Sequence, residues 1–331
     1  MVSLINKIYS YGRVFKEHIL DFRENFKDES NPICIKHKEH VKRLLLILEV
    51  FDVKMFYPYI LKRLFDVNGD IRDTRLINDF KILESFIIRR RLSPKGVNDY
   101  AIKYNNILKD GVKHLIEMDL TNDNSILSDN DIEIYINNIT DDKTAKVLLF
   151  CIEMLWRDNG NYDITALEYK YTLEHIMPKS WQQFWFDVTI TDKQGTVLDP
   201  MSEEGKHYRN LYIRSIGNMT LLTYSLNSGL KNADFKTKVE GRGEAKPGYR
   251  SHTSLRLTKE IVDGYYSDTV WDEDRIDKRA KRLLNVIRRY LRTEKPWKHS
   301  KSRQNMINYL CRKERKTAKK RTDGCGKTDV F

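Results

Sequence analysis

The segment formed by residues 171–178 constrains the fold of this chain more than any other stretch. A short apolar run ends there in an acid–histidine pair, Glu174 and His175, and Pro178 follows closely. Proline cannot continue a central strand and suits the first turn of a helix, so we expect a strand that ends at this pair. Because adjacent strand residues point to opposite faces, the pair could share one site only at such an end.

A second apolar run lies downstream at residues 216–222 and contains Asn218. It is followed by a short helical pattern that contains Asn227. The order of these segments predicts a strand, a second strand and a helix. Such an arrangement would bring Asn218 and Asn227 close to the acid–histidine pair.

These side chains suit the hydrolysis of a phosphodiester bond. A neutral histidine can take a proton from water, and a hard cation can offset charge on the phosphate and the leaving oxygen. Mg²⁺ takes few oxygen ligands from protein, and the Glu174 carboxylate and the Asn227 amide oxygen meet that demand. Each residue alone also has an ordinary structural explanation: a packed histidine, a turn at Asn218, a helix cap at Asn227. The ordered set is much harder to obtain by chance.

Three motifs together resemble a known family. They are Glu174-His175-Ile176-x-Pro178, then Gly217-Asn218-x-Thr220-Leu221, then Asn227 with Phe235-x-x-Lys238. This set is similar to the C-terminal nuclease domain of GmrSD-type restriction endonucleases. The similarity extends over roughly residues 40–295 and includes the helical region that precedes the nuclease in that family.

The resemblance implies a mainly α-helical α+β chain with a small ββα-metal core of the His-Me finger (HNH) type. It implies that His175 is the general base and that Asn218 orients it. It further implies that Asn227 and Glu174 bind Mg²⁺ or another divalent cation such as Mn²⁺, and that Lys238 contacts a phosphate.

The net charge of the chain, +12, favours a polyanionic partner. Nucleic acid fits better than a membrane, because no apolar run approaches the length of a spanning helix. The first residues lack the features of a signal peptide, and the four cysteines form no Cys-x-x-Cys pair. We therefore expect a cytoplasmic protein with reduced cysteines and with metal chemistry based on oxygen ligands.

Changes in pattern along the chain predict three parts. Residues 1–157 are expected to form a helical domain, residues 158–297 the nuclease domain with a C-terminal helix, and residues 298–331 a flexible basic tail. On the C-terminal helix, Arg279 and Arg282 belong to a stripe of basic residues. This stripe is expected to contact nucleic acid, although a solvated charged face is the commoner explanation of such a pattern.

GmrSD-type proteins also carry a ParB-like, nucleotide-dependent half with a Gly-Gln-Gln-Arg signature, which this sequence lacks. We therefore expect either a separate ParB-like subunit or a remnant of the full system. The predicted function is a metal-dependent DNA endonuclease that restricts phage DNA with modified bases. Two alternatives stay open: a non-catalytic nucleic-acid-binding subunit that kept the nuclease fold, and an RNase.

Overall fold

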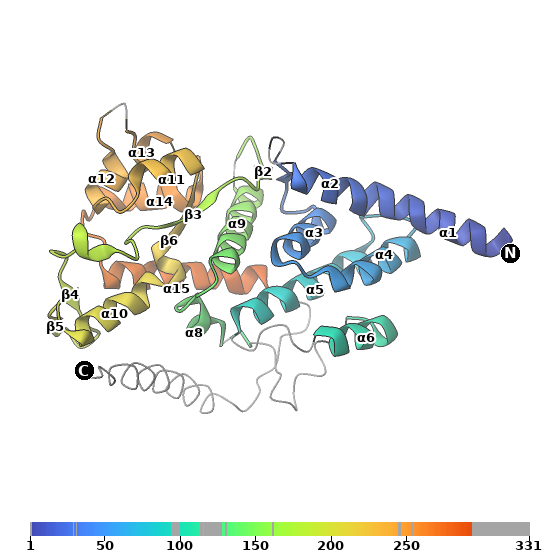
Figure 1. Cartoon of the computed structure of the whole chain (residues 1–331), viewed down its shortest axis with the longest axis horizontal. Helices are drawn as coiled ribbons and strands as arrows, with labels where there is room; N and C mark the ends of the chain where they lie inside the picture. The colour runs from blue at the N-terminus through green and yellow to red at the C-terminus, as the bar shows by residue number, and fades with distance from the viewer. Residues whose placement is uncertain are drawn as a thin grey trace, which may run out of the picture.

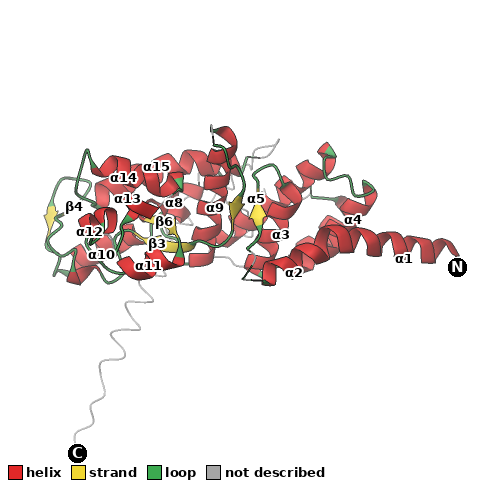
Figure 2. Ribbon diagram, turned by 90° about the horizontal axis from the view of Figure 1, so that it is seen from above, coloured by secondary structure: helices red, strands yellow, loops and turns green. Residues whose placement is uncertain are grey.

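The fold is taken from a computed structural model, which describes residues 2–292 except 29, 31, 94–99, 113–114, 116–127, 130, 161, 244–245 and 253. The predicted basic tail at residues 298–331 lies outside the described residues. Figures 1 and 2 show an elongated molecule, with the N-terminal helices at one end and the small strands β4 and β5 at the other.

The N-terminal half is helical, as its periodic apolar stripes predict. Its elements are α1 (Val2–Phe15), the π-helical η1 (Lys16–Leu20), α2 (Asp21–Lys27), α3 (His40–Phe51), η2 (Lys54–Phe56), α4 (Tyr57–Asp66), α5 (Thr74–Leu92), α6 (Tyr100–Asp110), α8 (Ile132–Ile136) and α9 (Asp142–Asn159). On α5, Leu76, Phe80 and Leu83 follow the predicted spacing and are fully buried. Each helix therefore directs one apolar face into a shared core.

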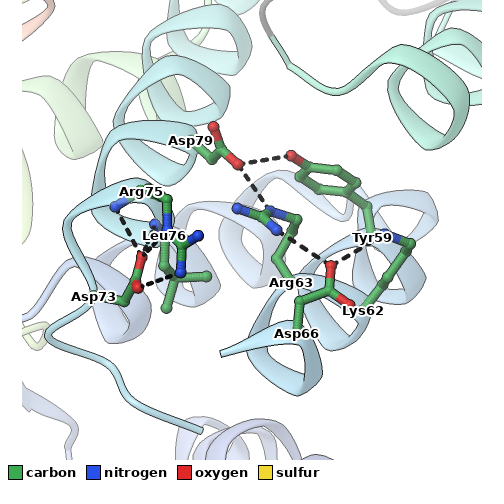
Figure 3. Close-up of polar contacts among 8 residues, drawn as sticks. All are labelled: Tyr59, Lys62, Arg63, Asp66, Asp73, Arg75, Leu76 and Asp79. Atoms are coloured by element: carbon green, nitrogen blue, oxygen red, sulfur yellow. Dashed lines mark hydrogen bonds and ion pairs between the residues drawn. The ribbon is translucent and has the colours of Figure 1, made fainter. Parts of the chain in front are cut away.

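Polar contacts fix α4 against α5 (Figure 3). Asp79 of α5 accepts a hydrogen bond from Arg63 Nε of α4 at 2.8 Å and a longer one from the Tyr59 hydroxyl at 3.4 Å. At the start of α5, Asp73 accepts hydrogen bonds from the main-chain N–H groups of Arg75 and Leu76, as a helix N-cap does. These contacts set the register of the two helices beside the apolar core.

The C-terminal half combines short strands with helices. Its elements are β2 (Leu167–Glu168), β3 (Thr172–His175), η4 (Trp181–Gln183), β4 (Ile190–Thr191), β5 (Val197–Leu198), α10 (Glu203–Ile213), η5 (Ile216–Asn218), β6 (Met219–Leu222), α11 (Tyr224–Leu230), α12 (Phe235–Glu240), α13 (Tyr249–His252), α14 (Arg256–Tyr265) and α15 (Glu273–Tyr290). The strands form antiparallel pairs: β3 with β6, β4 with β5, and β2 with β1 (Cys34–Ile35). The fold is mainly helical with small sheets, so the predicted α+β class is confirmed.

The largest apolar core continues across the predicted boundary at residues 157–158. It contains side chains of α3, α5 and α9 together with those of β6 and α15. A smaller core lies entirely in the C-terminal half and is built around Trp181, Trp185 and Trp271. The two halves therefore pack through one continuous apolar interior.

Helix α15 joins the two halves directly. Its first turns pack against η5, and its end reaches α5 of the N-terminal half. There the Tyr290 hydroxyl donates a hydrogen bond to Glu84, and Ser85 Oγ donates to the main-chain oxygen of Leu291 at 2.9 Å. Glu84 also holds the buried guanidinium of Arg43 from α3, at 2.7 Å. The last helix thereby completes a polar cluster that begins in the first half of the chain.

Within the described ranges, no helix combines the length and the apolar character needed to cross a membrane.

Candidate active site

Strand β3 holds the acid–histidine pair at its end, as predicted. It pairs with β6 so that Glu174 lies opposite Thr220 and His175 opposite Met219. Helix α11 follows β6 directly. Because strand side chains alternate, Glu174 and His175 are directed to opposite faces of this two-stranded sheet.

The carboxylate of Glu174 lies in the protein interior. Its Oε1 accepts hydrogen bonds from Lys238 Nζ at 2.5 Å and from the Tyr249 hydroxyl at 3.0 Å. Burial raises the pKa of Glu174 and lowers the pKa of Lys238, because the cost of desolvation exceeds their mutual attraction. Glu174 therefore serves first as the buried partner of Lys238, and no local sequence pattern indicates that Tyr249 completes this cluster.

The predicted phosphate contact of Lys238 is not supported by its position. The side chain is 0% exposed, and its ammonium group also donates to the main-chain oxygen of His175 at 2.9 Å. The helical spacing explains this burial: Lys238 follows the buried Phe235 by three residues, so both lie on the inner face of α12. Lys238 supports the end of β3 from within.

The imidazole of His175 is the least constrained functional group at this end of the sheet. It is partly buried and forms no hydrogen bond with any of the described residues. Burial, aided by the nearby cation of Lys179, lowers the pKa of His175 to about 4, although Asp142 opposes the shift. The ring is therefore neutral at pH 7 and has a free nitrogen that can accept a proton.

Lys179 and Asp142 form an exposed ion pair close to His175. Lys179 Nζ lies 3.3 Å and 3.4 Å from the two carboxylate oxygens of Asp142, which is the first residue of α9. Both side chains are more than half exposed. The sequence motifs do not include Lys179, although its position four residues after His175 and directly after Pro178 is a usable signal.

Asn218 is fully buried and uses its whole amide group in hydrogen bonds. Its Oδ1 accepts from the Met177 main-chain N–H at 2.9 Å and from Trp271 Nε1 at 3.1 Å. Its Nδ2 donates to the main-chain oxygens of Met177 at 2.8 Å and Ile213 at 3.2 Å. None of these bonds reaches the His175 ring, so Asn218 positions that residue only through the main chain that follows it.

Asn227 lies on α11 and faces the beginning of β3. Its Nδ2 donates to Thr172 Oγ1 and to the Leu173 main-chain oxygen, both at 3.0 Å. Because the Leu173 carbonyl can only accept, the amide nitrogen must face the strand and the amide oxygen must face away from it. That oxygen has no described hydrogen-bond donor and could bind a cation.

The donor set suits a hard cation only in part. Within the described residues, no group of three or more histidine, cysteine, aspartate or glutamate side chains is placed to hold a metal ion. The Asn227 oxygen is free, whereas one oxygen of Glu174 already accepts two hydrogen bonds. Mg²⁺ commonly retains several waters and takes one or two protein ligands, so Asn227 fits such an ion better than Glu174 does.

The two arginines predicted to bind nucleic acid differ in position. Arg279 is 4% exposed, and its guanidinium donates to the main-chain oxygens of Gly217 at 2.8 Å and Met219 at 2.7 Å. Arg279 is therefore buried and engaged by main-chain oxygens, and it does not lie on the exposed face that the basic stripe predicted. Arg282 is 55% exposed and lies 3.0 Å from Glu260, so its predicted role in nucleic-acid binding stays a prediction.

Comparison with known proteins gives one match. The family model for the C-terminal domain of GmrSD restriction endonucleases matches residues 121–286, just over half of the chain. This range includes β3, η5, β6, α11 and most of α15, and thus every predicted site residue. No curated protein and no solved structure matches the chain.

Proposed function

Because the chain belongs to the family of GmrSD restriction endonucleases through their C-terminal domain, we propose that it hydrolyses phosphodiester bonds in DNA. The observation that carries this proposal is the state of His175. Its imidazole lies partly buried at the end of β3 and forms no hydrogen bond with the described residues, so a ring nitrogen is available to a water molecule. We further propose that β3, β6 and α11 form the two strands and the helix of a ββα-metal nuclease core.

In the proposed reaction, His175 accepts a proton from a water molecule, which attacks the phosphorus atom while the bond from phosphorus to the 3′ oxygen breaks. The neutral ring is the form that can accept this proton. The leaving 3′ oxygen takes up a proton from solvent. Lys179 is exposed near His175 and is paired with Asp142. When substrate binds, the ammonium group of Lys179 leaves Asp142 and contacts the phosphate, to which it supplies positive charge. Asn218 keeps the main chain after His175 in place through both of its bonds to Met177.

We propose a divalent cation, Mg²⁺ or Mn²⁺, as the cofactor. When bound, such an ion offsets the negative charge on the phosphate and the leaving oxygen. Asn227 would hold it through its free amide oxygen. The contribution that we expected from Glu174 is restricted to the oxygen not engaged by Lys238 and Tyr249.

The substrate and partners follow from the family and the charge of the chain. Restriction endonucleases act on DNA, and a net charge of +12 favours a polyanion. We therefore propose phage DNA with modified bases as the substrate, in antiviral defence. A ParB-like, nucleotide-dependent subunit is the partner that we would test first.

The decisive experiment is nicking of supercoiled plasmid in Mg²⁺ by the wild type and by His175→Ala. Loss of a general base predicts a decrease of about 10²–10⁴-fold in rate, with DNA binding retained. The matched control is His207→Ala, because His207 is an exposed histidine of α10 and lies outside the proposed site. A chelator should stop cleavage by the wild type and by the control. Equal cleavage by wild type and His175→Ala would refute the assignment.

A non-catalytic DNA-binding subunit is the second candidate. The buried pairing of Glu174 with Lys238 favours it, because this pairing engages the acidic side chain of the site. The same plasmid assay separates the two candidates: tight, salt-sensitive binding without cleavage in Mg²⁺ or Mn²⁺ would select the binding subunit. Parallel RNA and DNA substrates would test the third possibility, an RNase.

A further inference from the structure

A small pocket lies between α14 and α15, away from His175. Its volume is about 160 Å³, and its charged lining consists of Arg275, Lys278, Arg279 and Arg282 with a single carboxylate, that of Glu260. On α15, Arg275 lies three and four residues before Lys278 and Arg279, and Arg282 lies four and three residues after them, so the four basic residues lie close together on one side of the helix. The lining therefore carries a clear excess of positive charge.

The single carboxylate does not balance this charge. Glu260 lies 3.0 Å from Arg282 and 3.4 Å from Arg256, so it is shared between two guanidinium groups. Lys278 has a partner on its own helix, Asp274 at 2.6 Å, but both of these side chains are more than half exposed. Solvent screens such exposed pairs, and they exchange partners at little cost.

Arg279 lines the pocket and has an unmet hydrogen-bond donor. Its Nη1 donates to the main-chain oxygens of Gly217 and Met219 and its Nη2 to that of Leu257, whereas its buried Nε has no hydrogen-bond partner among the described residues. Buried donors of this kind are rare, and each one calls for an acceptor. The geometry thus combines a fixed, buried guanidinium with the mobile, exposed cations of Lys278 and Arg282.

Arg275 is held rigidly at the wall of the pocket. Its guanidinium lies over the rings of Trp271 and Phe235, at 5.0 Å and 5.2 Å from their centroids, and donates to the Val270 main-chain oxygen at 2.7 Å. A planar guanidinium fixed in this way is suited to oxyanions such as phosphate. The rigid wall reduces the entropy lost when an anion binds.

We infer that this pocket binds a phosphate group, as a second site distinct from the one around His175. The pocket lies on the other side of the sheet from the His175 imidazole, because α14 bonds to β6 through Thr258 and Thr220, and Thr220 lies on the face of Glu174. The phosphate is either a phosphodiester of the DNA backbone or a free phosphate or mononucleotide. The first source rests on the proposed function, whereas the second does not.

The test uses the full chain without divalent cations, so that cleavage plays no part. Inorganic phosphate is titrated against chloride at constant ionic strength, and the midpoint of thermal unfolding is followed. Binding of a duplex oligonucleotide is measured by fluorescence anisotropy over a range of salt concentrations. The variant is Arg282→Gln, and the control is Lys281→Gln, which removes one charge from the adjacent position, where the exposed Lys281 pairs with the partly buried Asp277.

We expect phosphate to raise the unfolding midpoint of the wild type and of Lys281→Gln, but not that of Arg282→Gln. If the source is DNA, Arg282→Gln also binds the duplex more weakly, and the slope of log K against log salt falls by about 1 relative to the control. If phosphate stabilisation is lost while duplex binding equals that of the control, the ligand is a free phosphate or mononucleotide.

Identical behaviour of Arg282→Gln and Lys281→Gln in both assays would overturn the inference. Arg282 is exposed, so its substitution should leave the fold intact, and the unfolding midpoint without phosphate verifies this. Both assays can be repeated in His175→Ala. The phosphate-binding proposal can then fail or succeed independently of the nuclease proposal, because neither assay depends on cleavage.

Discussion

Glu174 and His175 are consecutive residues of β3, but their surroundings are opposite. The carboxylate of Glu174 is enclosed by Lys238 and Tyr249, whereas the imidazole of His175 has no hydrogen bond among the described residues and lies near the exposed pair Lys179–Asp142. Each side of the strand therefore has one lysine near its titratable group. One lysine is buried and permanently paired, and the other is exposed and exchangeable.

This difference gives the two residues different roles: Glu174 stabilises the fold, and His175 is available for chemistry. A motif in which an acid precedes a histidine suggests joint action, but alternation along a strand places the two side chains apart. The buried side fixes the end of β3, and the exposed side leaves a neutral base accessible. The three tests below address the two sides in turn, from the largest expected effect to the smallest.

The largest effect is expected from Lys238→Met, which leaves the Glu174 carboxylate buried without its cation. Such a change should cost about 3–5 kcal/mol in the free energy of unfolding. Urea denaturation measures it, with Lys236→Met as the control, because Lys236 lies on the same helix and is exposed. The double variant Glu174→Gln/Lys238→Met should recover part of the loss. If Lys238→Met costs no more stability than the control, Glu174 and Lys238 do not form a buried ion pair.

The second effect is the pH dependence of stability that the lowered pKa of His175 should cause. Burial lowers the pKa of His175 to about 4, so between pH 6.5 and pH 4 the unfolded chain binds the proton more readily than the folded one. This group therefore contributes stability above pH 6.5 that is lost as the pH falls, at up to about 1.4 kcal/mol per pH unit. His37 and His40 have pKa values lowered in the same way, to about 4 and about 3.

The contribution of His175 is isolated by comparing the wild type with His175→Gln at pH 7 and pH 5. The wild type should lose more stability on acidification than the variant. The difference between the two losses in unfolding free energy is the contribution of the buried imidazole. Parallel losses in the two proteins would show that His175 titrates as an exposed histidine does.

The smallest of the three effects is expected from Lys179→Gln. Removal of this exposed cation should lower kcat/KM for plasmid nicking by about tenfold, equivalent to about 1.4 kcal/mol. Stability should not change, because an exposed ion pair contributes little. Lys62→Gln is the control, since Lys62 forms a comparable exposed pair with Asp66 on α4. If both variants lose the same activity, Lys179 acts only through the overall charge.

The helices were predictable because their apolar residues are periodic, and the central strands because each follows from a short apolar run. The stripe of α5 and the runs that became β3 and β6 needed no information beyond their spacing. The partners of Glu174 could not be predicted in the same way. Lys238 and Tyr249 lie 64 and 75 residues further along the chain, and no local pattern links them to the strand. Side-chain pairing over such distances depends on the tertiary fold.

The family resemblance implies a phosphate contact for Lys238, and the basic stripe implies a nucleic-acid contact for Arg279, although the helical spacing of both residues indicates burial. Arg279 lies three residues after Ile276 and four before Leu283, both of which are fully buried. Helical periodicity therefore puts it on the inner face, where main-chain oxygens near η5 and β6 needed donors. Periodicity is the better guide when charge and spacing disagree.

The contacts at the end of α15 have a consequence for protein synthesis. Ser85 bonds to the main-chain oxygen of Leu291, 206 residues later, and Glu84 accepts the hydroxyl of Tyr290. During translation, α3 and α5 leave the ribosome long before these partners exist, so the buried cluster around Glu84 stays incomplete. Completion of the N-terminal core therefore waits for the last helix, and the nascent chain reaches its compact form only after the nuclease segment has been made in full.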